Sequence, residues 1–211
     1  LCPRHLDPAS CRADGWRAGT RGGDVESGTG MSAFTSSRLS FRELRPEDVS
    51  DAYVGWMNDP AVHQHLETRF TPQDMGTVTA FVAAQLADPE TFLFRIAQQE
   101  DDRHIGNIKL GPINRHHSSA QLSLLIGERT LHGRGYATEA IAQVTCWGFE
   151  HCGLHRIEGG CYAENLGSLR AFLKAGYTIE GFRRDAVVTM AGRRSGAFWF
   201  ARLANDPEAY Q

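Results

Sequence analysis

The chain has 211 residues, of which 41% are hydrophobic and 22% are charged, so it is long enough to bury one substantial core. Its 22 lysines and arginines stand against 25 acidic residues, which gives a formal net charge of −3. This balance excludes the uniform basic field that draws a chain onto nucleic acid or an anionic membrane, so we expect neither as a partner.

Residues 1–30 contain six glycines and two prolines but few large apolar side chains. Such a segment buries too little apolar surface to fold alone, although a regulatory arm can have the same composition. Met31 then opens a stretch that looks like an ordinary translation start. We expect residues 1–36 to be a disordered or non-native extension, residues 37–205 a single domain and residues 206–211 a C-terminal tail.

The first predicted elements are a strand around 39–41, a helix over 46–57 and a second helix over 71–86. Apolar residues alternate with polar ones in the strand and recur at helical spacing in both helices. Pro46 and Pro72 stand in the first turns of the two helices, where proline is tolerated, and a threonine before Pro72 is the expected cap.

Three short strands are predicted next, and short polar turns between them favour antiparallel pairing. Helices and strands then alternate, and the order predicts an α/β (α+β) chain with a mixed sheet and helices on its faces. The predicted ranges are strands 92–96, 108–110 and 122–126, helix 137–152, strand 155–162, helix 168–175, and strands 177–181, 187–190 and 197–203.

The stretch from Ile126 to Ala140 carries the most specific pattern, because a predicted strand runs into a loop with Gly133 and Gly135 and a predicted helix follows. At such a junction unpaired backbone N–H groups converge, the helix dipole adds positive potential, and glycines let a phosphate approach. The spacing matches neither the dinucleotide motif G-x-G-x-x-G nor the P-loop motif G-x-x-x-x-G-K-[ST]. We therefore expect an anion site of another kind.

Two segments resemble motifs of the GCN5-related N-acetyltransferases, the GNAT superfamily. His132-Gly133-Arg134-Gly135-Tyr136-Ala137 resembles the acetyl-CoA loop [QR]-x-x-G-x-[GA], with His132 in the place of the usual glutamine or arginine, and its continuation to Ala140 is similar to the RimJ/RimL-type branch. The segment from Asn165 to Tyr177 is similar to that branch's N-x-x-S-x-x-x-x-x-K-x-G-[FY] motif. The resemblance spans residues 39–203.

This resemblance implies the GNAT fold, a mixed and mostly antiparallel sheet of about six or seven strands with helices on both faces. It also implies acetyl-CoA as cosubstrate and no metal, with backbone amides from His132 to Thr138 on the pyrophosphate and with the strand that ends at Ile126 splaying from the next one. The implied cofactor-binding residues are Leu125, Ile126, His132, Gly133, Arg134, Gly135, Tyr136, Ala137, Thr138, Asn165, Ser168, Phe172 and Lys174.

Amide formation from a thioester needs an uncharged amine, donors for the developing oxyanion and a proton for the departing thiolate. The resemblance implies Ser168 as the acid, because Phe172 stands where many relatives have a tyrosine and cannot donate a proton. Tyr162 or an ordered water is the alternative acid. Ser168 could instead cap the following helix, and Asn165, which the resemblance places on the pantetheine, could be a structural turn residue.

The base is harder to assign, because Val187 and Gln121 occupy the two positions where relatives carry a carboxylate. Asp185 shares a face with Val187 if the strand continues, and Glu158 lies on a predicted strand nearby. We expect one of these two carboxylates to act as the base. A water-mediated base, with proximity supplying most of the acceleration, is the alternative.

Histidines offer two further hypotheses. His104 and His155 are additional candidates for the base, because histidine is the residue type that can change its charge near neutral pH. His63, His65 and Glu67 form an H-x-H-x-E pattern that suggests a metal site, but alternating ligands require a strand and this stretch is predicted as a short helix or loop. We therefore expect no metal.

The five cysteines include no C-x-x-C pair, which argues against a disulfide framework. Direct transfer needs no covalent enzyme intermediate, so we expect Cys146 and Cys161 to be small packing residues. No apolar run approaches the ~18 residues of a membrane-spanning helix, and the simplest interpretation is a reducing, cytoplasmic setting.

The sequence thus predicts an acetyl-CoA-dependent N-acetyltransferase that transfers the acetyl group directly to a primary amine, as a monomer or homodimer. The stretch 104–110 looks like the small-molecule side of the branch, particularly amino-sugar acetyltransferases. A polyamine pocket would gather carboxylates, whereas a nucleotide-sugar pocket would need cations such as Arg42, Arg69 or Arg115. The alternatives are a protein N-terminal acetyltransferase of the ribosomal-protein-like kind, a non-catalytic acyl-CoA-binding regulatory module, and a phosphate-loop protein unrelated to acyl transfer.

Overall fold

The computed structural model describes residues 33–207. Most of the expected extension 1–36, and residues 208–211 of the expected tail, lie outside this part. The expected domain boundary is too late, because strand β1 (Phe34–Thr35) pairs with β2 (Leu39–Glu43). Phe34 is buried and stacks on Phe41, so the folded domain includes these residues.

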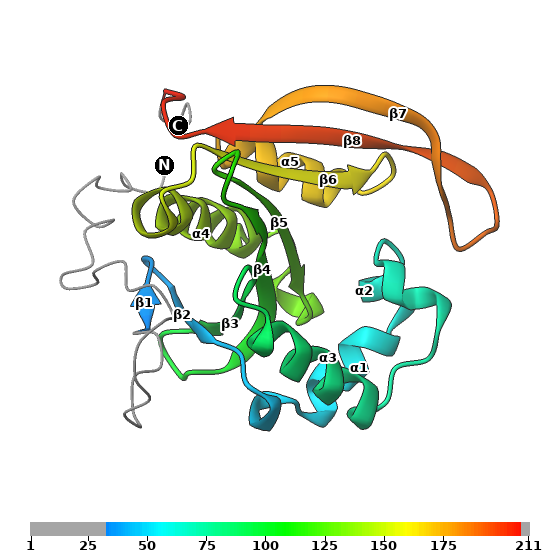
Figure 1. The fold of residues 1–211 in the computed structure, drawn as a ribbon. Helices are drawn as coiled ribbons and strands as arrows, with labels where there is room; N and C mark the ends of the chain where they lie inside the picture. The colour runs from blue at the N-terminus through cyan, green and yellow to red at the C-terminus, as the bar shows by residue number, and fades with distance from the viewer. Residues whose placement is uncertain (1–32, 208–211) are drawn as a thin grey trace.

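A single eight-stranded sheet has the order β1-β2-β3-β4-β5-β6-β8-β7 (Figure 1). Every neighbouring pair is antiparallel except β5 and β6, which confirms the expected mixed class. The count is eight instead of six or seven because β1 joins the edge, while the strands expected at 177–181 and 187–190 are one strand, β7. The other strands are β3 (Phe92–Gln98), β4 (His104–Asn114), β5 (Ser119–Ile126), β6 (Arg156–Tyr162), β7 (Thr178–Val188) and β8 (Arg194–Leu203).

Helices cover both faces of the sheet, as expected (Figure 1). Neighbouring residues of a strand point to opposite faces, so Phe94 packs in the large core with α4 and α5, whereas Leu93 packs in a smaller core with α1 and α3. None of the described helices is long and apolar enough to cross a membrane. The helices are η2 (Pro46–Asp48), α1 (Asp51–Asn58), α2 (Pro60–His63), η3 (Glu67–Phe70), α3 (Met75–Ala87), η4 (Arg129–Leu131), α4 (Tyr136–Cys152) and α5 (Leu166–Lys174).

The first two helices differ from their predicted bounds. The helix expected over 46–57 is broken after η2, because the backbone at Val49 is extended with ψ 118°. α1 begins only after Ser50, whose side chain caps it. α3 begins later than expected because Asp74, and not the threonine before Pro72, accepts the capping hydrogen bond.

β5 and β6 part soon after they pair. Their pairing covers only 119–121 and 156–158, whereas β5 runs on to Ile126 and β6 to Tyr162. The expected splay is thereby confirmed. It leaves backbone groups of both strands facing an opening, which we call the β5–β6 gap.

Candidate active site

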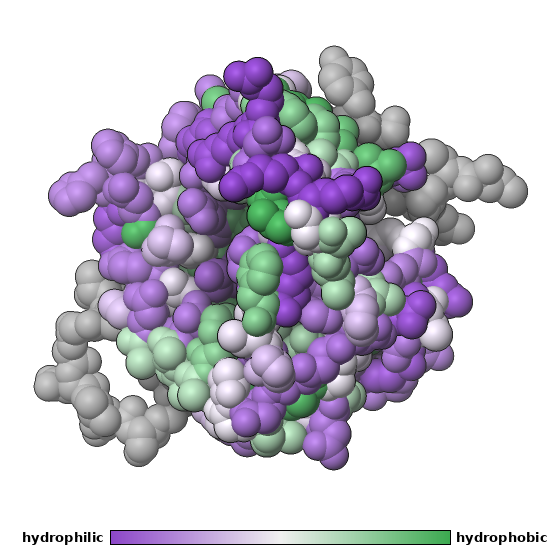
Figure 2. Space-filling model, turned by 90° about the vertical axis from the view of Figure 1, so that its right-hand side faces the viewer, coloured by the Kyte–Doolittle hydropathy of each residue, from purple (hydrophilic) through white to green (hydrophobic). Residues whose placement is uncertain are grey.

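A cavity of about 540 Å³ lies at the β5–β6 gap. Residues 122–125 line it from β5 and residues 159–162 line it from β6, and further walls come from α1, η3, β4 and α5. The side of the molecule where the short helices face the β7–β8 hairpin is hollowed near its centre, with hydrophobic residues surrounded by hydrophilic ones (Figure 2). The cavity is of the size that small-molecule sites have.

The loop between β5 and α4 presents free backbone donors. Within the described part of the chain, the N–H groups of Gly133, Gly135 and residues 136–138 have no hydrogen-bond acceptor. His132 N–H donates to the Arg129 carbonyl at 3.0 Å, and Arg134 N–H donates to the Leu131 carbonyl at 3.3 Å. The expected set of amides from His132 to Thr138 is therefore too wide, since these two are already used. The rest converge at the N-terminus of the 17-residue α4, whose dipole favours an anion.

Gly135 shapes this loop. It precedes α4 with φ 85°, a left-handed conformation that a residue with a Cβ rarely adopts. A Cβ placed there would have Arg38 Nη2 as its nearest neighbour, at 3.5 Å, and one placed at Gly133 would meet nothing within 4 Å. No side chain fills the loop at these two positions, so the residues present fit a pyrophosphate.

Two contacts hold the loop against the end of β5. The His132 ring nitrogen Nε2 lies 2.8 Å from the Ile126 carbonyl, and it must donate because a carbonyl only accepts. The Trp56 ring of α1 lies where a side chain at Gly127 would stand, since a Cβ built there falls 1.9 Å from the indole. His132 therefore acts through its side chain as an anchor of the loop.

One face of α5 lines the cavity, with Asn165, Ser168 and Phe172 at helical spacing. Asn165 Oδ1 accepts a hydrogen bond from Ser168 N–H at 3.1 Å, so Asn165 is the cap of this helix and Ser168 is not. The Ser168 hydroxyl has no hydrogen-bond partner among residues 33–207, which leaves it available to a ligand. Lys174 is exposed in the last turn, and neither it nor Ile126 lines the cavity.

Residues 38–178 match the family model for the acetyltransferase (GNAT) domain. The chain belongs to the GNAT acetyltransferase family. Among its relatives, this GNAT chain is 38% identical over 106 residues to the probable N-acetyltransferase YjcK of Bacillus subtilis, a match that covers 49% of the chain and 57% of YjcK. It is 27% identical over 178 residues to the uncharacterized N-acetyltransferase p20 of Bacillus licheniformis, covering 83% of the chain and 98% of p20. The chain thus spans little more than half the length of YjcK but nearly all of p20.

Solved structures share the GNAT fold with this chain. A spermidine N-acetyltransferase from Vibrio cholerae, solved with CoA and spermine, superposes with a TM-score of 0.72 at 20% identity, covering 81% of this chain and 98% of that one. An acetyltransferase of the GNAT family from Bacillus anthracis superposes with a TM-score of 0.70, also at 20% identity, covering 82% and 98%.

A polar cluster that the sequence did not predict contributes to the wall of the GNAT cavity. Glu67 of η3 is the only carboxylate among the described lining residues. The Tyr162 hydroxyl donates to this carboxylate and accepts from Arg69 Nη1 at 2.7 Å. Arg69 is almost fully buried and also donates to the carbonyl oxygen of Val188 at 2.5 Å. Burial, and then the neighbouring Glu67, raises the pKa of Tyr162, so its hydroxyl keeps its proton at neutral pH.

Cys161 is the one thiol among the described lining residues. Burial raises its pKa to about 11, so the thiol is protonated at neutral pH and is a poor nucleophile. Cys161 is also part of the large hydrophobic core, and its thiol is free. This agrees with a packing role.

The two carboxylates expected as base lie away from the cavity. The expectation that Asp185 shares a regular strand face with Val187 is wrong, because the strand bulges between Arg183 and Val187 and Asp185 has φ 52°. Asp185 is exposed, and only Val187 lines the cavity. Glu158 does not line it either, and its Oε2 lies 3.2 Å from Arg156 Nη2.

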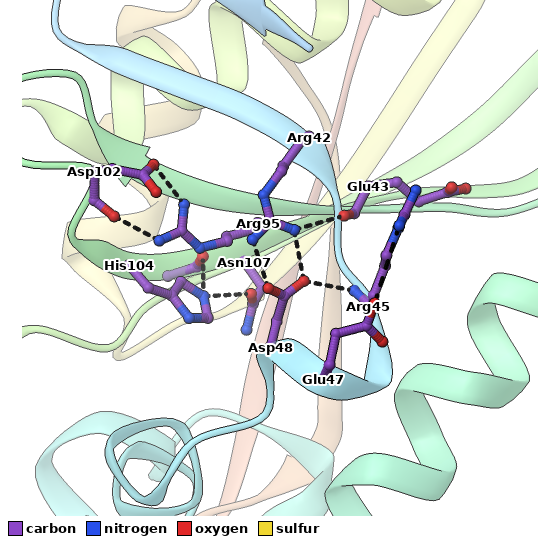
Figure 3. Close-up of polar contacts among 10 residues, drawn as sticks. Arg42, Glu43, Arg45, Glu47, Asp48, Arg95, Asp102, His104 and Asn107 are labelled. Carbon is purple, nitrogen blue, oxygen red and sulfur yellow. Dashed lines mark hydrogen bonds and ion pairs between the residues drawn. The ribbon is translucent and has the colours of Figure 1, made fainter. Parts of the chain in front are cut away.

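His155, His104 and Arg42 also lie outside the cavity wall, whereas His65 lines it. His155 is exposed, and His104 is tied to the backbone carbonyl of Gly106. Arg42 makes a short ion pair with Asp48 on β2 and η2 (Figure 3).

Arg115 pairs with Glu90 at 2.9 Å and does not line the cavity.

His65 contacts the Tyr162 ring edge-on, with 5.7 Å between ring centres. His63 is buried in α2, and within residues 33–207 no three histidines, cysteines or acids group closely enough to hold a metal.

Proposed function

We propose that this chain is an acetyl-CoA-dependent N-acetyltransferase of the RimJ/RimL-type branch, which transfers the acetyl group directly to a primary amine. One observation carries the proposal. The free amides at the start of α4 belong to the loop that follows the end of β5, the strand that forms one edge of the β5–β6 gap, and the Ser168 hydroxyl and the Glu67 carboxylate line the cavity at this gap. A phosphate-bearing arm held at one end therefore has its other end among groups that can move protons.

The amides of Gly133, Gly135 and residues 136–138 are assigned to the pyrophosphate. Residues 122–125 pair with β4 but not with β6, and their backbone groups on the β6 side, together with the lining residue Leu125, are assigned to the pantetheine arm. Asn165 is able to donate from its amide nitrogen because its oxygen caps α5. When bound, acetyl-CoA supplies the thioester whose carbonyl carbon accepts the amine. Phe172, 1% exposed, packs behind this part of the cavity.

Proton transfer is assigned to two groups. The Ser168 hydroxyl passes a proton to the departing thiolate and recovers one from a water molecule, because it lines the cavity and has no other partner in the described chain. Glu67 takes the proton that the amine loses, directly or through water, and replaces Asp185 and Glu158 in this role. Tyr162 holds the Glu67 carboxylate in place through its hydrogen bond.

The cavity favours a small amine over a protein N-terminus as acceptor, since its volume of about 540 Å³ suits a small molecule. Among small amines, the single lining carboxylate argues against a polyamine, while an amino sugar is compatible with the polar walls. Relatives of the polyamine kind share this fold, so the fold alone does not choose.

Free-thiol release from acetyl-CoA tests the proposal over a panel of glucosamine, spermidine, simple ω-amino acids and a peptide with a free N-terminus. We expect turnover with at least one small amine. Turnover with the peptide alone would favour an N-terminal acetyltransferase, and tight CoA binding without turnover on any amine would favour a non-catalytic regulatory module.

A further inference from the structure

The part of the cavity beneath α1 is rich in hydrogen-bond donors. Asn107 and Lys109 of β4 point to the same face of the sheet, and Lys109 stands opposite Ser123 of β5. Tyr53 of α1 covers this face, and all four residues line the cavity. None of them is an acid. We call these four residues the donor subsite.

Asn107 is held with its amide nitrogen free. His104 Nε2 lies 2.9 Å from Asn107 Oδ1 and 3.0 Å from the Gly106 carbonyl, and it must donate because both partners are acceptors (Figure 3). Asn107 Nδ2 therefore points away from His104. Asn107 is only 5% exposed, and within the described chain its Nδ2 has a contact with the Tyr53 hydroxyl that falls short of a well-formed hydrogen bond. A buried amide without a well-formed hydrogen bond is costly, so this atom favours an acceptor from outside the chain.

Lys109 adds a positive charge on the same face of β4 as Asn107. It forms no ion pair among the described residues. Hydrogen bonds, and to a lesser extent the Lys109 charge, lower the pKa of the Asp88 carboxylate at the end of α3. This carboxylate accepts hydrogen bonds from Glu90 N–H at 3.0 Å and from Thr91. Burial raises the pKa of Tyr53 to about 12, so its hydroxyl also remains a donor.

Glu67 faces the same cavity from another position. It bonds to Tyr162 at the end of β6, whereas Asn107 and Lys109 lie on β4, with β5 between these strands. Because β5 and β6 have parted before Tyr162, the backbones are separated by more than two regular strand spacings, which are about 10 Å, and the side chains shorten the span between the charged ends. A ligand that satisfies both ends has an amine at one end and a group of acceptor oxygens at the other.

We propose that the acceptor amine carries an anionic oxygen group, in the first instance a carboxylate, which the amide of Asn107 and the ammonium of Lys109 bind. The inference rests on the proposed acetyltransferase function and narrows its substrate class. A polyamine brings a second positive charge toward Lys109 and offers the Asn107 amide no acceptor. An amino sugar fits only if it bears an acidic group.

Matched pairs of amines test the subsite. Acetyl transfer is measured with 4-aminobutyrate against butylamine, 6-aminohexanoate against hexylamine, 2-aminoethyl phosphate against ethanolamine, and with spermidine. We expect kcat/KM for the better aminocarboxylate to exceed that of its alkylamine by about tenfold or more, as a charge-assisted contact predicts. Lys109→Met removes the charge and is expected to reduce this preference to about threefold or less, mainly through KM.

Asn107→Asp is the sharper variant. It keeps the oxygen that His104 contacts and replaces the free donor by an acceptor, so the preference should fall further while the alkylamine is still acetylated. Arg45→Met is the control, because this half-exposed arginine has only a distant partner, Glu47 at 4.0 Å, and does not line the cavity. It should leave the preference unchanged.

Each outcome decides something. A stronger preference for the aminoalkyl phosphate supports the anionic group and identifies phosphate as its source. Preferred turnover of spermidine, or a preference that Lys109→Met does not change, overturns the subsite and leaves the acetyltransferase in place. If no amine is turned over, the proposed acetyltransferase function is refuted. The donor subsite is then tested by the affinity for 6-aminohexanoate in calorimetry. Equal affinity of wild type and Lys109→Met overturns the subsite.

Discussion

Arg38 and Glu139 form an ion pair, with 2.6 Å between Nη2 and Oε2, that joins the residue before β2 to the first turn of α4. Glu139 is only 9% exposed, and its other oxygen accepts hydrogen bonds from Ser36 Oγ at 2.7 Å and from Arg38 N–H at 2.8 Å. Arg38 Nη1 also donates to the Arg134 carbonyl at 3.1 Å. The start of the folded chain thereby holds the loop assigned to the pyrophosphate.

Replacing Arg38 is expected to loosen this loop. Arg38→Ala leaves the Glu139 carboxylate short of a charged partner, so we expect a loss of about 1–2 kcal/mol in the free energy of unfolding. The affinity for CoA should fall severalfold in calorimetry, because the free amides lose their fixed geometry. Arg38→Lys should restore part of the stability but less of the affinity, since a lysine cannot reach Glu139 and Arg134 with a planar fork. Unchanged CoA affinity in Arg38→Ala would show that the ion pair does not organise the loop.

Gly135→Glu is expected to abolish CoA binding. The substitution places a side chain on a residue with φ 85° and a negative charge where the pyrophosphate is assigned. Gly153→Glu is a matched control, because Gly153 ends the same helix with φ 62° and open space around it. Both variants should lose a similar amount of stability, about 1 kcal/mol, while only Gly135→Glu loses CoA in calorimetry. Equal CoA affinity in the two variants would contradict the placement of the pyrophosphate.

Substitution of Ser168 is expected to lower the catalytic rate, whereas substitution of Asn165 is expected to lower the stability of the protein. Ser168→Ala should lower kcat about 10²-fold with little change in the unfolding free energy, because the serine does not cap α5. Asn165→Ala should cost about 1 kcal/mol of stability, because it removes the cap at 3.1 Å. Stopped-flow or steady-state thiol release and urea denaturation provide the two measurements. A Ser168→Ala enzyme with full kcat would pass the role of acid to Tyr162 or to water.

Glu67→Gln is expected to lower kcat/KM about 10²-fold at neutral pH and to leave CoA binding intact. The amide keeps the shape and a hydrogen bond with Tyr162 but cannot take a proton. Activity of the variant should recover as the pH rises toward the pKa of the free amine, since more amine is then already uncharged. Wild-type activity in Glu67→Gln across that pH range would leave the base to water.

Mild acid is expected to destabilise the protein through His104. Burial lowers the pKa of His104 in the folded state, whereas the unfolded chain has an ordinary value of about 6.5. The unfolded state therefore binds the proton more readily, and the stability linked to this group is present above about pH 6.5 and lost as the pH falls through the folded pKa. Urea denaturation at pH 7.5 and 5.5 should show a smaller difference for His104→Gln than for wild type. Burial also lowers the pKa of His65, but this residue is the same in both proteins.

Much of the fold follows from sequence periodicity. Alternation identified the central strands, helical spacing identified α3 and α4, and the glycine pattern of the loop identified the start of α4 within one residue. The break at Val49 was missed because a 3-10 turn followed by an extended residue keeps nearly helical spacing of the apolar side chains. β1 was missed because two residues are too few to show alternation.

The candidate site was predictable where backbone carries it and not where side chains meet across the fold. The loop amides and the face of α5 belong to local motifs. Glu67 and Tyr162 are 95 positions apart, and only the packing of η3 against the end of β6 brings them together. The bulge at Asp185 turned the expected base away from the cavity, and no residue type in that stretch announces it.

The β5–β6 gap also divides the sheet into two halves that few hydrogen bonds connect. Strands β1 to β5 and strands β6 to β8 are joined by three residue pairs at one end of β5 and β6. Along the rest of their length, no hydrogen bonds connect these two strands. A ligand that binds between β5 and β6 takes the place of the missing inter-strand hydrogen bonds and connects the two halves of the sheet. The amide hydrogens of 122–126 and 159–162 that do not bond to β4 or β8 thus report, by how slowly they exchange with solvent, whether the two halves move as one body.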